Sequence, residues 1–410
     1  PNTSTDRTIT LPDATGTLLN SDGSAASLTA IPAANITGTL PAISGASLTS
    51  LPIQNRPNSN PIIINGDMSV SQRGTANTDE SASGFYRVDR MNVGMSNIGE
   101  FRLSQESLSS GAAFNAGFKK AFRIDCAVAD ASPASGDIGN MTYKLEGNTV
   151  QAFKKGTSNA ETATLAFWVK SNKTGTAQVT LIDGDNSRQV GATYTISSAD
   201  TWEHKVLNYA ADTTGALDND NNKSLEIEFA LDAGSDFTSG AVPSAWEASA
   251  NTDRSVNDLA LQDNTANDWA ITGLQLEVGT YTSATLPPFQ FESYGDNLAR
   301  CQRYYQQLVN GTTGGLPGGS PYSAGSQVFC PYSFLTEMRA APTLVTSNNS
   351  GDFRARHGDL VTFATYDGFN GVSPRNCTFA TDDVSGSVVG DFYWMEPNQS
   401  TALLALSSEL

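Results

Sequence analysis

The sequence predicts an all-β protein with an extended N-terminal shaft, and three observations support this fold class. Short segments in which apolar and polar residues alternate recur through residues 60–291 and again through 309–410. The intervals between them are rich in Gly, Asn, Asp and Ser, which is typical of turns. One stretch, within 292–308, has helical spacing instead. We expect a shaft at 1–59, an antiparallel jelly-roll β-sandwich at 60–291, a helical joint at 292–308 and a small β-sandwich tip at 309–410.

The shaft segment, residues 1–59, contains no Phe, Tyr or Trp and only five charged residues. The motif SLTAIP at 27–32 returns as SLTSLP at 47–52. Such composition is common in disordered linkers. If the segment is ordered, its few bulky apolar groups cannot compensate for the lost conformational entropy of a single chain. Identical copies would supply the missing contacts, so we predict a parallel, intertwined homotrimer.

The module at 60–291 opens with PIIINGDMSV, in which Asn65-Gly66 is the turn signal. Gly273 interrupts the last alternating segment by one residue, as a β-bulge would. Some nine or ten half-buried strands indicate an antiparallel sandwich. The alternating sets are Met91/Val93/Met95, Phe122/Ile124/Cys126/Val128, Met141/Tyr143/Leu145, Leu165/Phe167/Val169, Val179/Leu181, Leu225/Ile227/Phe229/Leu231, Trp269/Ile271 and Leu274/Leu276/Val278.

The joint reads as a helix because Leu298, Cys301, Tyr305 and Leu308 recur at helical intervals. Ser293 or Asp296 can cap its start, and the spacing predicts about 13 helical residues. In the tip, a Gly-rich loop at 311–325 precedes the strand candidates VFCPY, PTLVTS, LVTFATY, CTFAT, GDFYWM and ALLAL. We expect this tip to form trimers with its copies.

Charge and cysteine content limit the partners. The chain has 42 acidic and 24 basic residues, a net charge of −18, so we expect neither nucleic acid nor an anionic membrane surface as a partner. No apolar run is long enough to span a bilayer. The four scattered cysteines do not have zinc-site spacing, although disulfides stay open. The chain starts without methionine, and we expect an upstream part.

Catalysis has little support in the sequence. The two histidines, His204 and His357, accompany no nucleophile motif, and we interpret them as structural or surface residues. A glycosidase needs two carboxylates about 5–9 Å apart. An acidic surface produces neighbouring carboxylates by chance, so we predict that the chain is not an enzyme. The neighbours are Asp382/Asp383, Asp352/Asp359 and Asp296/Glu292.

Two Asp/Asn-rich loops could bind calcium: Asp183/Asp185/Asn186 and Asp218/Asp220/Asn222. The second departs from an EF-hand, because Lys223 stands where glycine is required. We interpret both as solvated turns and expect no cofactor, with a structural calcium as the alternative.

Aromatic residues in loops are the best candidates for recognition, because sugars stack their apolar C–H faces on aromatic rings while polar side chains bond the hydroxyls. The alternative is that Tyr366 and Trp394 lie in the core or at a trimer interface. The candidates are Tyr366, Asp367, Phe369 and Asn370 in TYDGFNG, Tyr322 in the Gly-rich loop, and Trp394 at the end of GDFYW.

Several segments resemble tail fibres of tailed bacteriophages and related virion appendages. LQLEVG at 274–279, followed by ESYGDNLARCQRYYQ at 292–306, carries the main resemblance. Residues 7–19 and 28–41 resemble fibre-shaft sequence, and MRAAPTL at 338–344 resembles the start of a tip module. The pattern LAFWVKS…LEIEFAL…WAITGLQLEVG resembles carbohydrate-binding modules, which implies sugar binding.

The resemblance implies a homotrimeric virion protein, assembled in the bacterial cytoplasm, that attaches to a host surface glycan or protein through its C-terminal modules. Its N-terminal side would dock on other phage proteins. One alternative is a head decoration or connecting fibre without a receptor role. Another is a glycan depolymerase, which the absence of a β-helix repeat disfavours.

Overall fold

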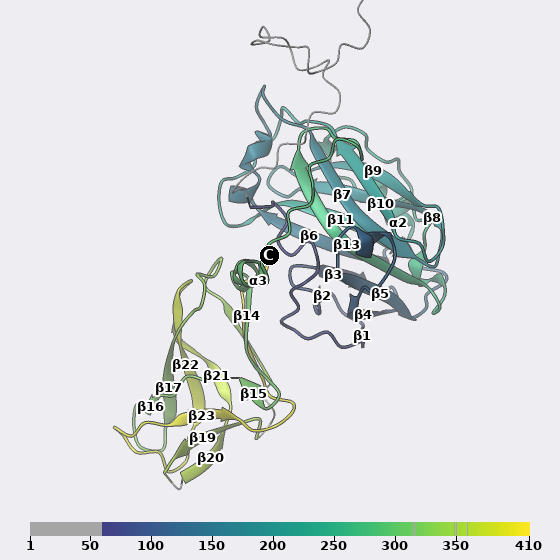
Figure 1. Cartoon of the computed structure of the whole chain (residues 1–410). Coiled ribbons are helices and arrows are strands. Elements are labelled where there is room, and N and C mark those ends of the chain that lie inside the picture. Colours follow the sequence, from purple (N-terminus) through teal and green to yellow (C-terminus); the bar gives the residue numbers. More distant parts are fainter. Residues whose placement is uncertain (1–59, 315, 348, 350, 359) are drawn as a thin grey trace, which may run out of the picture. The chain divides into compact units, whose positions relative to one another are not determined.

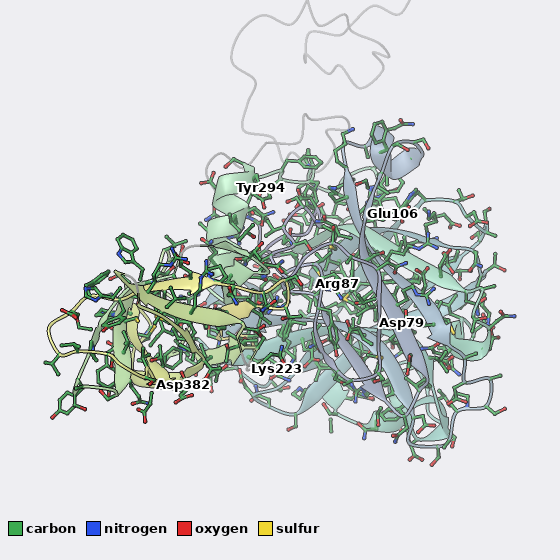
Figure 2. The ribbon with its side chains drawn as sticks, turned by 90° about the horizontal axis from the view of Figure 1, so that it is seen from below. Asp79, Arg87, Glu106, Lys223, Tyr294 and Asp382 are labelled. Atoms are coloured by element: carbon green, nitrogen blue, oxygen red, sulfur yellow. The ribbon has the colours of Figure 1, made fainter. Side chains whose placement is uncertain are left out.

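The computed structural model describes residues 60–314, 316–347, 349, 351–358 and 360–410. Its ribbon is shown in Figure 1 and its side chains in Figure 2. The predicted shaft at 1–59 lies outside the described residues. Within them, the α-helices are α1 (Ala112–Asn115), α2 (Ser235–Thr238) and α3 (Tyr294–Gln302), and 3-10 helices span Gly147–Thr149, Gln151–Phe153, Asn251–Asp253 and Leu261–Asp263. None of these helices has the length and apolar character needed to cross a membrane.

The first module is a sandwich of two antiparallel sheets, as predicted (Figure 1). The six-stranded sheet has the order β1 (Thr78–Glu80), β4 (Glu100–Ser107), β5 (Lys120–Val128), β13 (Asp268–Val278), β7 (Ala163–Ser171), β10 (Glu203–Tyr209). The seven-stranded sheet has the order β12 (Glu247–Ala248), β9 (Arg188–Ile196), β8 (Gly175–Asp183), β11 (Lys223–Ala233), β6 (Ile138–Glu146), β3 (Asn92–Ser96), β2 (Gly84–Phe85).

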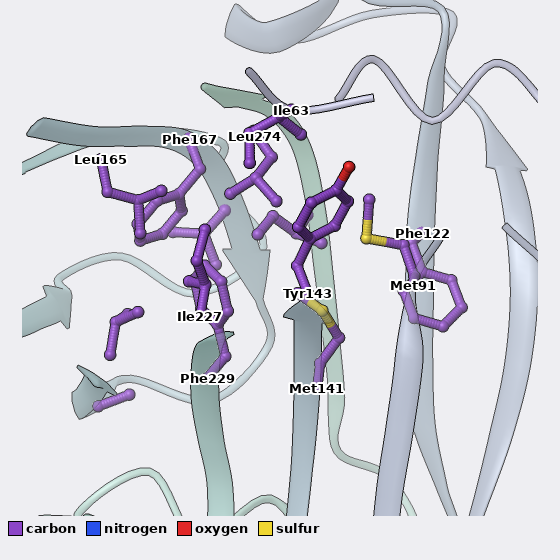
Figure 3. Close-up of a cluster of buried hydrophobic side chains, with 14 of the residues drawn as sticks. Ile63, Met91, Phe122, Met141, Tyr143, Leu165, Phe167, Ile227, Phe229 and Leu274 are labelled. Carbon is purple, nitrogen blue, oxygen red and sulfur yellow. The ribbon is translucent and has the colours of Figure 1, made fainter. Parts of the chain in front are cut away.

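The alternating side chains of these strands meet between the two sheets. Successive side chains of a strand point to opposite faces, so every second residue faces the interior. Phe167 on β7 and Phe229 on β11 lie edge to face with ring centroids 5.0 Å apart. Figure 3 shows them in one cluster with Leu165 and Ile227. Val128 is the exception, because it lies at the end of β5 and is 47% exposed.

The predicted bulge at Gly273 is confirmed. The register of β13 against β7 shifts between Thr272 and Gln275, and Gly273 has φ +65°. An ideal Cβ at this position would lie 2.7 Å from Cζ of Phe118. The bulge therefore needs glycine both for its backbone conformation and for space.

The helix of the joint is shorter than the sequence predicts. Its start is as expected, because Ser293 Oγ accepts a hydrogen bond from the Asp296 amide at 3.2 Å. The helix α3 ends at Gln302, however, and Tyr305 already belongs to β14 (Tyr305–Asn310). Tyr305 and Leu308 are therefore strand residues, and the prediction of about 13 helical residues is wrong.

Polar contacts fix α3 and the residues after it to the first module. Arg303 donates two hydrogen bonds to Glu146, at 2.9 and 2.7 Å, and the Tyr304 hydroxyl donates a third. Burial by itself would raise the pKa of Glu146, but these hydrogen bonds outweigh it and hold the pKa below its ordinary value. Near the C-terminus, Glu409 pairs with the buried Arg90 at 2.5 Å.

The C-terminal module consists of three small antiparallel sheets around one core. The first has the order β15 (Thr313–Gly314), β14, β24 (Leu403–Ser407), β18 (Thr343–Thr346). The second has the order β16 (Ser320–Pro321), β17 (Gln327–Ser333), β22 (Asn376–Asp383), β21 (Tyr366–Val372). The third has the order β20 (Leu360–Ala364), β19 (Phe353–His357), β23 (Trp394–Pro397).

Candidate functional site

The predicted recognition loop at 366–370 is instead the strand β21, which pairs with β22. Tyr366 is fully buried, with its ring 5.1 Å from Phe353 and 5.5 Å from Phe379. Phe369 is partly buried against Phe379. Tyr366 therefore belongs to the core and is not offered to a ligand, which corrects the prediction for this residue.

The other predicted residues reach the surface at separate places on the tip. Asp367 and Asn370 are exposed on β21, and Asp367 accepts a hydrogen bond from Gln327 at 3.3 Å. Tyr322 is 81% exposed after β16. Trp394 is 66% exposed at the start of β23. Of the six predicted residues, Trp394 lies on a sheet face that also carries arginine and glutamate side chains.

Trp394 belongs to the outer face of the sheet β20–β19–β23. Arg356 on β19 is paired in register with Val361 on β20 and with Trp394 on β23. Register partners share one face of a sheet, so these three exposed side chains form a row across it. Arg354 and Glu396 form the next row on the same face. We call Arg354, Arg356, Val361, Trp394 and Glu396 the tip platform.

Ion pairs hold the polar groups of the tip platform in place. Glu396 accepts a hydrogen bond from Nε of Arg354 at 2.8 Å and lies 3.5 Å from Nε of Arg356. Arg354 also donates to Asn398 Oδ1 at 3.1 Å. Beside them, the Phe392 ring meets the Trp394 ring edge to face at 5.8 Å. The platform thus combines an open aromatic face with fixed hydrogen-bonding groups.

Beneath the platform, the inward side chains of the same strands belong to the core. Phe353 and Ala355 are fully buried, and Met395 is 4% exposed. These buried side chains anchor the sheet, and with it the platform, to the core of the tip. The sequence reasoning missed β19, although FRARH alternates between apolar and charged residues with the period of a strand. That alternation was the signal for Arg354 and Arg356.

Four of the predicted carboxylate neighbours, Asp382, Asp352, Asp296 and Glu292, have structural partners. Asp382 accepts the Thr365 amide at 2.8 Å, and Asp383 follows it in a strand, so the two point to opposite faces. Asp352 is buried and accepts from Thr401 at 2.6 Å. Asp296 accepts from Ser293, and Glu292 pairs with Arg300 at 2.6 Å. Asp359 lies outside the described residues.

The carboxylates of the calcium candidates contact donor groups of the protein itself. Asp183 and Asp212 both contact the buried ammonium of Lys155, the latter at 2.9 Å. In the other loop, Asp220 accepts from the Asn222 amide at 2.8 Å, and the Asp218 amide donates to Asp185 of the first loop at 2.9 Å. No group of three or more His, Cys, Asp or Glu side chains that could hold a metal occurs within the described parts of the chain.

The histidines and cysteines have structural contacts of their own. His204 stacks on Trp168 with ring centroids 4.9 Å apart, and burial lowers the pKa of its imidazole. His357 lies 3.4 Å from Asp391 at the edge of the tip sheet. The four cysteines are buried and carry free thiols.

Solved structures of a phage tailspike domain and of carbohydrate-binding modules align with about half of the chain. No family model and no curated protein matches it. A solved structure of the enzymatically active domain of bacteriophage CBA120 tailspike protein 4 aligns with 13% identity and a TM-score of 0.27. That alignment covers 53% of this chain and 21% of the tailspike structure, so this chain spans about a fifth of its length.

Carbohydrate-binding modules align over a similar portion. The family 11 module of a Clostridium thermocellum cellulosomal cellulase has 9% identity, a TM-score of 0.26, and coverage of 51% of this chain and 99% of the module. TmCBM61 in complex with β-1,4-galactotriose has 6% identity, a TM-score of 0.26, and coverage of 54% and 99%. At these TM-scores the alignments carry no functional argument, and the β-sandwich assignment rests on the sheets themselves.

Proposed function

We propose that this chain is a structural protein of a tailed-bacteriophage virion: a homotrimeric fibre or fibre-like appendage whose C-terminal module binds a host surface glycan. The sequence resemblance at 274–306 and 338–344 supports the virion role. The observation that carries the binding role is the tip platform, where Trp394 exposes two thirds of its surface beside fixed charged groups.

The chemistry of the tip platform suits a sugar. The indole of Trp394 can stack on an apolar C–H face, and Arg354, Arg356 and Glu396 can bond hydroxyl groups at its edge. The ion pair between Arg354 and Glu396 limits their side-chain freedom before a ligand arrives. Less entropy is then lost on binding.

A fibre multiplies such weak contacts. One exposed sheet face gives modest affinity for a glycan, but the three tips of one fibre, and the several fibres of one virion, bind together. Avidity therefore lets a shallow platform serve for attachment. The same exposed tryptophan could pack against a second copy of the chain, so the test must separate binding from assembly.

We infer binding without hydrolysis. Asp382, Asp352 and Glu292 bond a backbone amide, a hydroxyl and an arginine, and these contacts engage them in the fold. A hydrolase would need two carboxylates free to face a glycosidic bond. Release of reducing sugar from a glycan that the protein binds would contradict this part of the proposal.

The test is binding of the purified protein to an array of bacterial surface polysaccharides. Trp394→Ala should reduce the signal at least tenfold, because it removes the stacking face. Leu335→Ala is the matched control, since Leu335 is 71% exposed in the same module but outside the tip platform. Equal binding by both variants would overturn the binding role, and loss of trimers in Trp394→Ala alone would assign the tryptophan to assembly.

A further inference from the structure

Three Asn-Gly pairs occur in the chain, and the structure places them in different surroundings. They are Asn65-Gly66, Asn310-Gly311 and Asn370-Gly371. An asparagine followed by glycine is prone to spontaneous deamidation, because glycine has no side chain to hinder attack by its amide nitrogen on the preceding carboxamide. Whether a pair reacts in the folded protein depends on how freely these two groups can meet.

Asn65 is kept from this reaction by its burial and its hydrogen bonds. The residue is 1% exposed, and its Nδ2 donates to the carbonyl oxygens of Val70 and Asp89 at 2.9 and 3.0 Å. Its Oδ1 accepts from the Val70 amide at 2.9 Å. The carboxamide must break these bonds before Gly66 can attack it, so this pair reacts only when the surrounding structure opens.

Asn310 is exposed, but the amide nitrogen that would attack it is engaged. Gly311 donates from this nitrogen to the carbonyl oxygen of Ala402 at 2.7 Å. The backbone of Asn310 is also fixed at the end of β14 by register partners on β15 and β24. The pair therefore has to leave its hydrogen-bonded position before the ring can close.

Asn370-Gly371 combines an exposed carboxamide with backbone outside the regular ladder. Both residues are exposed on β21, the last strand of its sheet (Figure 1). The register of β21 against β22 shifts between Phe369 and Val372, so the two residues between them form a bulge without register partners in β22. Gly371 has φ +123°, and no atom lies within 4 Å of the position that a Cβ would take.

We propose that Asn370 deamidates spontaneously in the folded protein. The Gly371 nitrogen forms a bond to Cγ of Asn370, the bond from Cγ to Nδ2 breaks, and Nδ2 leaves as ammonia with the proton of the Gly371 amide. Water then opens the succinimide ring at either of its carbonyl carbons, which gives aspartate or isoaspartate. Hydroxide accelerates the first step, because it removes the amide proton.

The products differ from asparagine in charge and, for isoaspartate, in backbone length. Each adds one negative charge to a strand that already carries Asp367. In isoaspartate the chain runs through Cβ, which inserts one carbon atom before Gly371. The bulge can take up this atom, because its residues are not held in register with β22. The tip is therefore converted slowly into a more acidic form.

The test incubates the full chain at pH 8.5 and 37 °C and follows the peptides that contain the three pairs by mass spectrometry, with an isoaspartate-specific methyltransferase assay. In the folded protein, Asn370 should deamidate at least tenfold faster than Asn65 and Asn310, and isoaspartate should be among its products. In concentrated urea the three rates should be similar, because only the fold distinguishes the pairs.

Asn370→Gln should remove the acidic species seen by ion-exchange chromatography, because the longer side chain must close a larger and less favourable ring. Asn310→Gln is the matched control and should leave that species unchanged. Each variant exchanges one exposed amide for another. The proposal is overturned if Asn370 reacts no faster than the other two asparagines in the folded protein, or if the acidic species persists in Asn370→Gln. Neither readout depends on glycan binding.

Discussion

Lys155 shows how one side chain can take the place of a metal ion. Its ammonium contacts Asp183 and Asp212, and the Lys155 side chain is only 5% exposed to solvent. It also donates to the carbonyl oxygen of Gly215 at 2.9 Å. Two carboxylates and a carbonyl are ligands that calcium uses in proteins. The cation that this loop needs is therefore supplied by the chain itself.

Lys155→Met should lower the free energy of unfolding by about 3–5 kcal/mol, because it leaves the buried carboxylate of Asp183 without a cation, while Asp212 keeps its ion pair with Arg188. Chemical denaturation measures the effect. Lys154→Met is the control, since that neighbouring lysine is 52% exposed and pairs with Glu161 at the surface; its effect should stay below about 1 kcal/mol. Equal effects of the two variants would refute the role of Lys155.

The unsubstituted protein should keep its melting temperature when calcium chloride or a chelator is added. The Asp183 and Asp212 carboxylates already bond the Lys155 ammonium, which a calcium ion would have to displace. A thermal-shift assay in matched ionic strength measures this. A rise of several degrees with calcium, reversed by chelator, would mean that another set of residues binds the ion.

The buried carboxyl group of Asp89 should make the stability of the protein depend on pH. Burial raises its pKa from 3.8 to about 6, although Arg73 and hydrogen bonds from Gln72 oppose the shift, and Glu409 is a further charged neighbour. The folded form thus holds a proton that the unfolded form releases, so stability falls as pH rises from about 4 to 6. Asp89→Asn removes this loss.

Denaturation at pH 4, 5, 6 and 7 should therefore show the stability of Asp89→Asn improving relative to the unsubstituted protein, by up to about 3 kcal/mol across the range. Because Asp89→Asn and the unsubstituted protein are compared at each pH, the titration of the other carboxylates contributes equally to both and cancels. A constant difference at all four pH values would mean that Asp89 titrates near its ordinary pKa.

At the residue scale, sequence could identify aromatic candidates but not which way each ring faces. Tyr366 and Trp394 both begin strands. One fills the tip core and the other lies open on the surface. The direction follows from strand register, which depends on partners far along the chain. Trp394 became distinctive only once β19 placed Arg354 and Arg356 beside it.

Among the elements, the bulge in β13 is the one most tightly tied to a single residue. Gly273→Ala should destabilise the protein by about 1–3 kcal/mol, because alanine at φ +65° is strained and its Cβ meets Phe118. Gly368→Ala is the matched strand control, with no atom within 4 Å of the added carbon. Melting temperatures measure both, and similar values would show that the bulge tolerates a side chain.

The strands of the first module could be predicted from sequence because large apolar residues alternate along them, even where both faces of a strand are buried, as in β13. The tip could not be predicted as well. Turn signals in TYDGFNG concealed β21, whose register against β22 shifts twice. The helical spacing of Tyr305 and Leu308 concealed β14, because an apolar residue every third or fourth position also fits the end of a helix followed by a strand.

At the scale of the whole molecule, we propose that three identical chains assemble. This rests on the composition of residues 1–59, which lie outside the described residues, and on the resemblance to fibre shafts. Mass photometry of the full chain should give three times the mass of one chain. Deleting residues 1–59 should shift the distribution toward smaller species. A solitary full-length chain at micromolar concentration would remove the fibre proposal.

The most direct test of the central claim is adsorption of the virion to its host. Particles that carry Trp394→Ala should adsorb at least tenfold more slowly than unsubstituted particles, with trimer content unchanged, while Leu335→Ala particles adsorb normally. This result would support attachment through the tip platform. Normal adsorption by Trp394→Ala particles with intact trimers would contradict it.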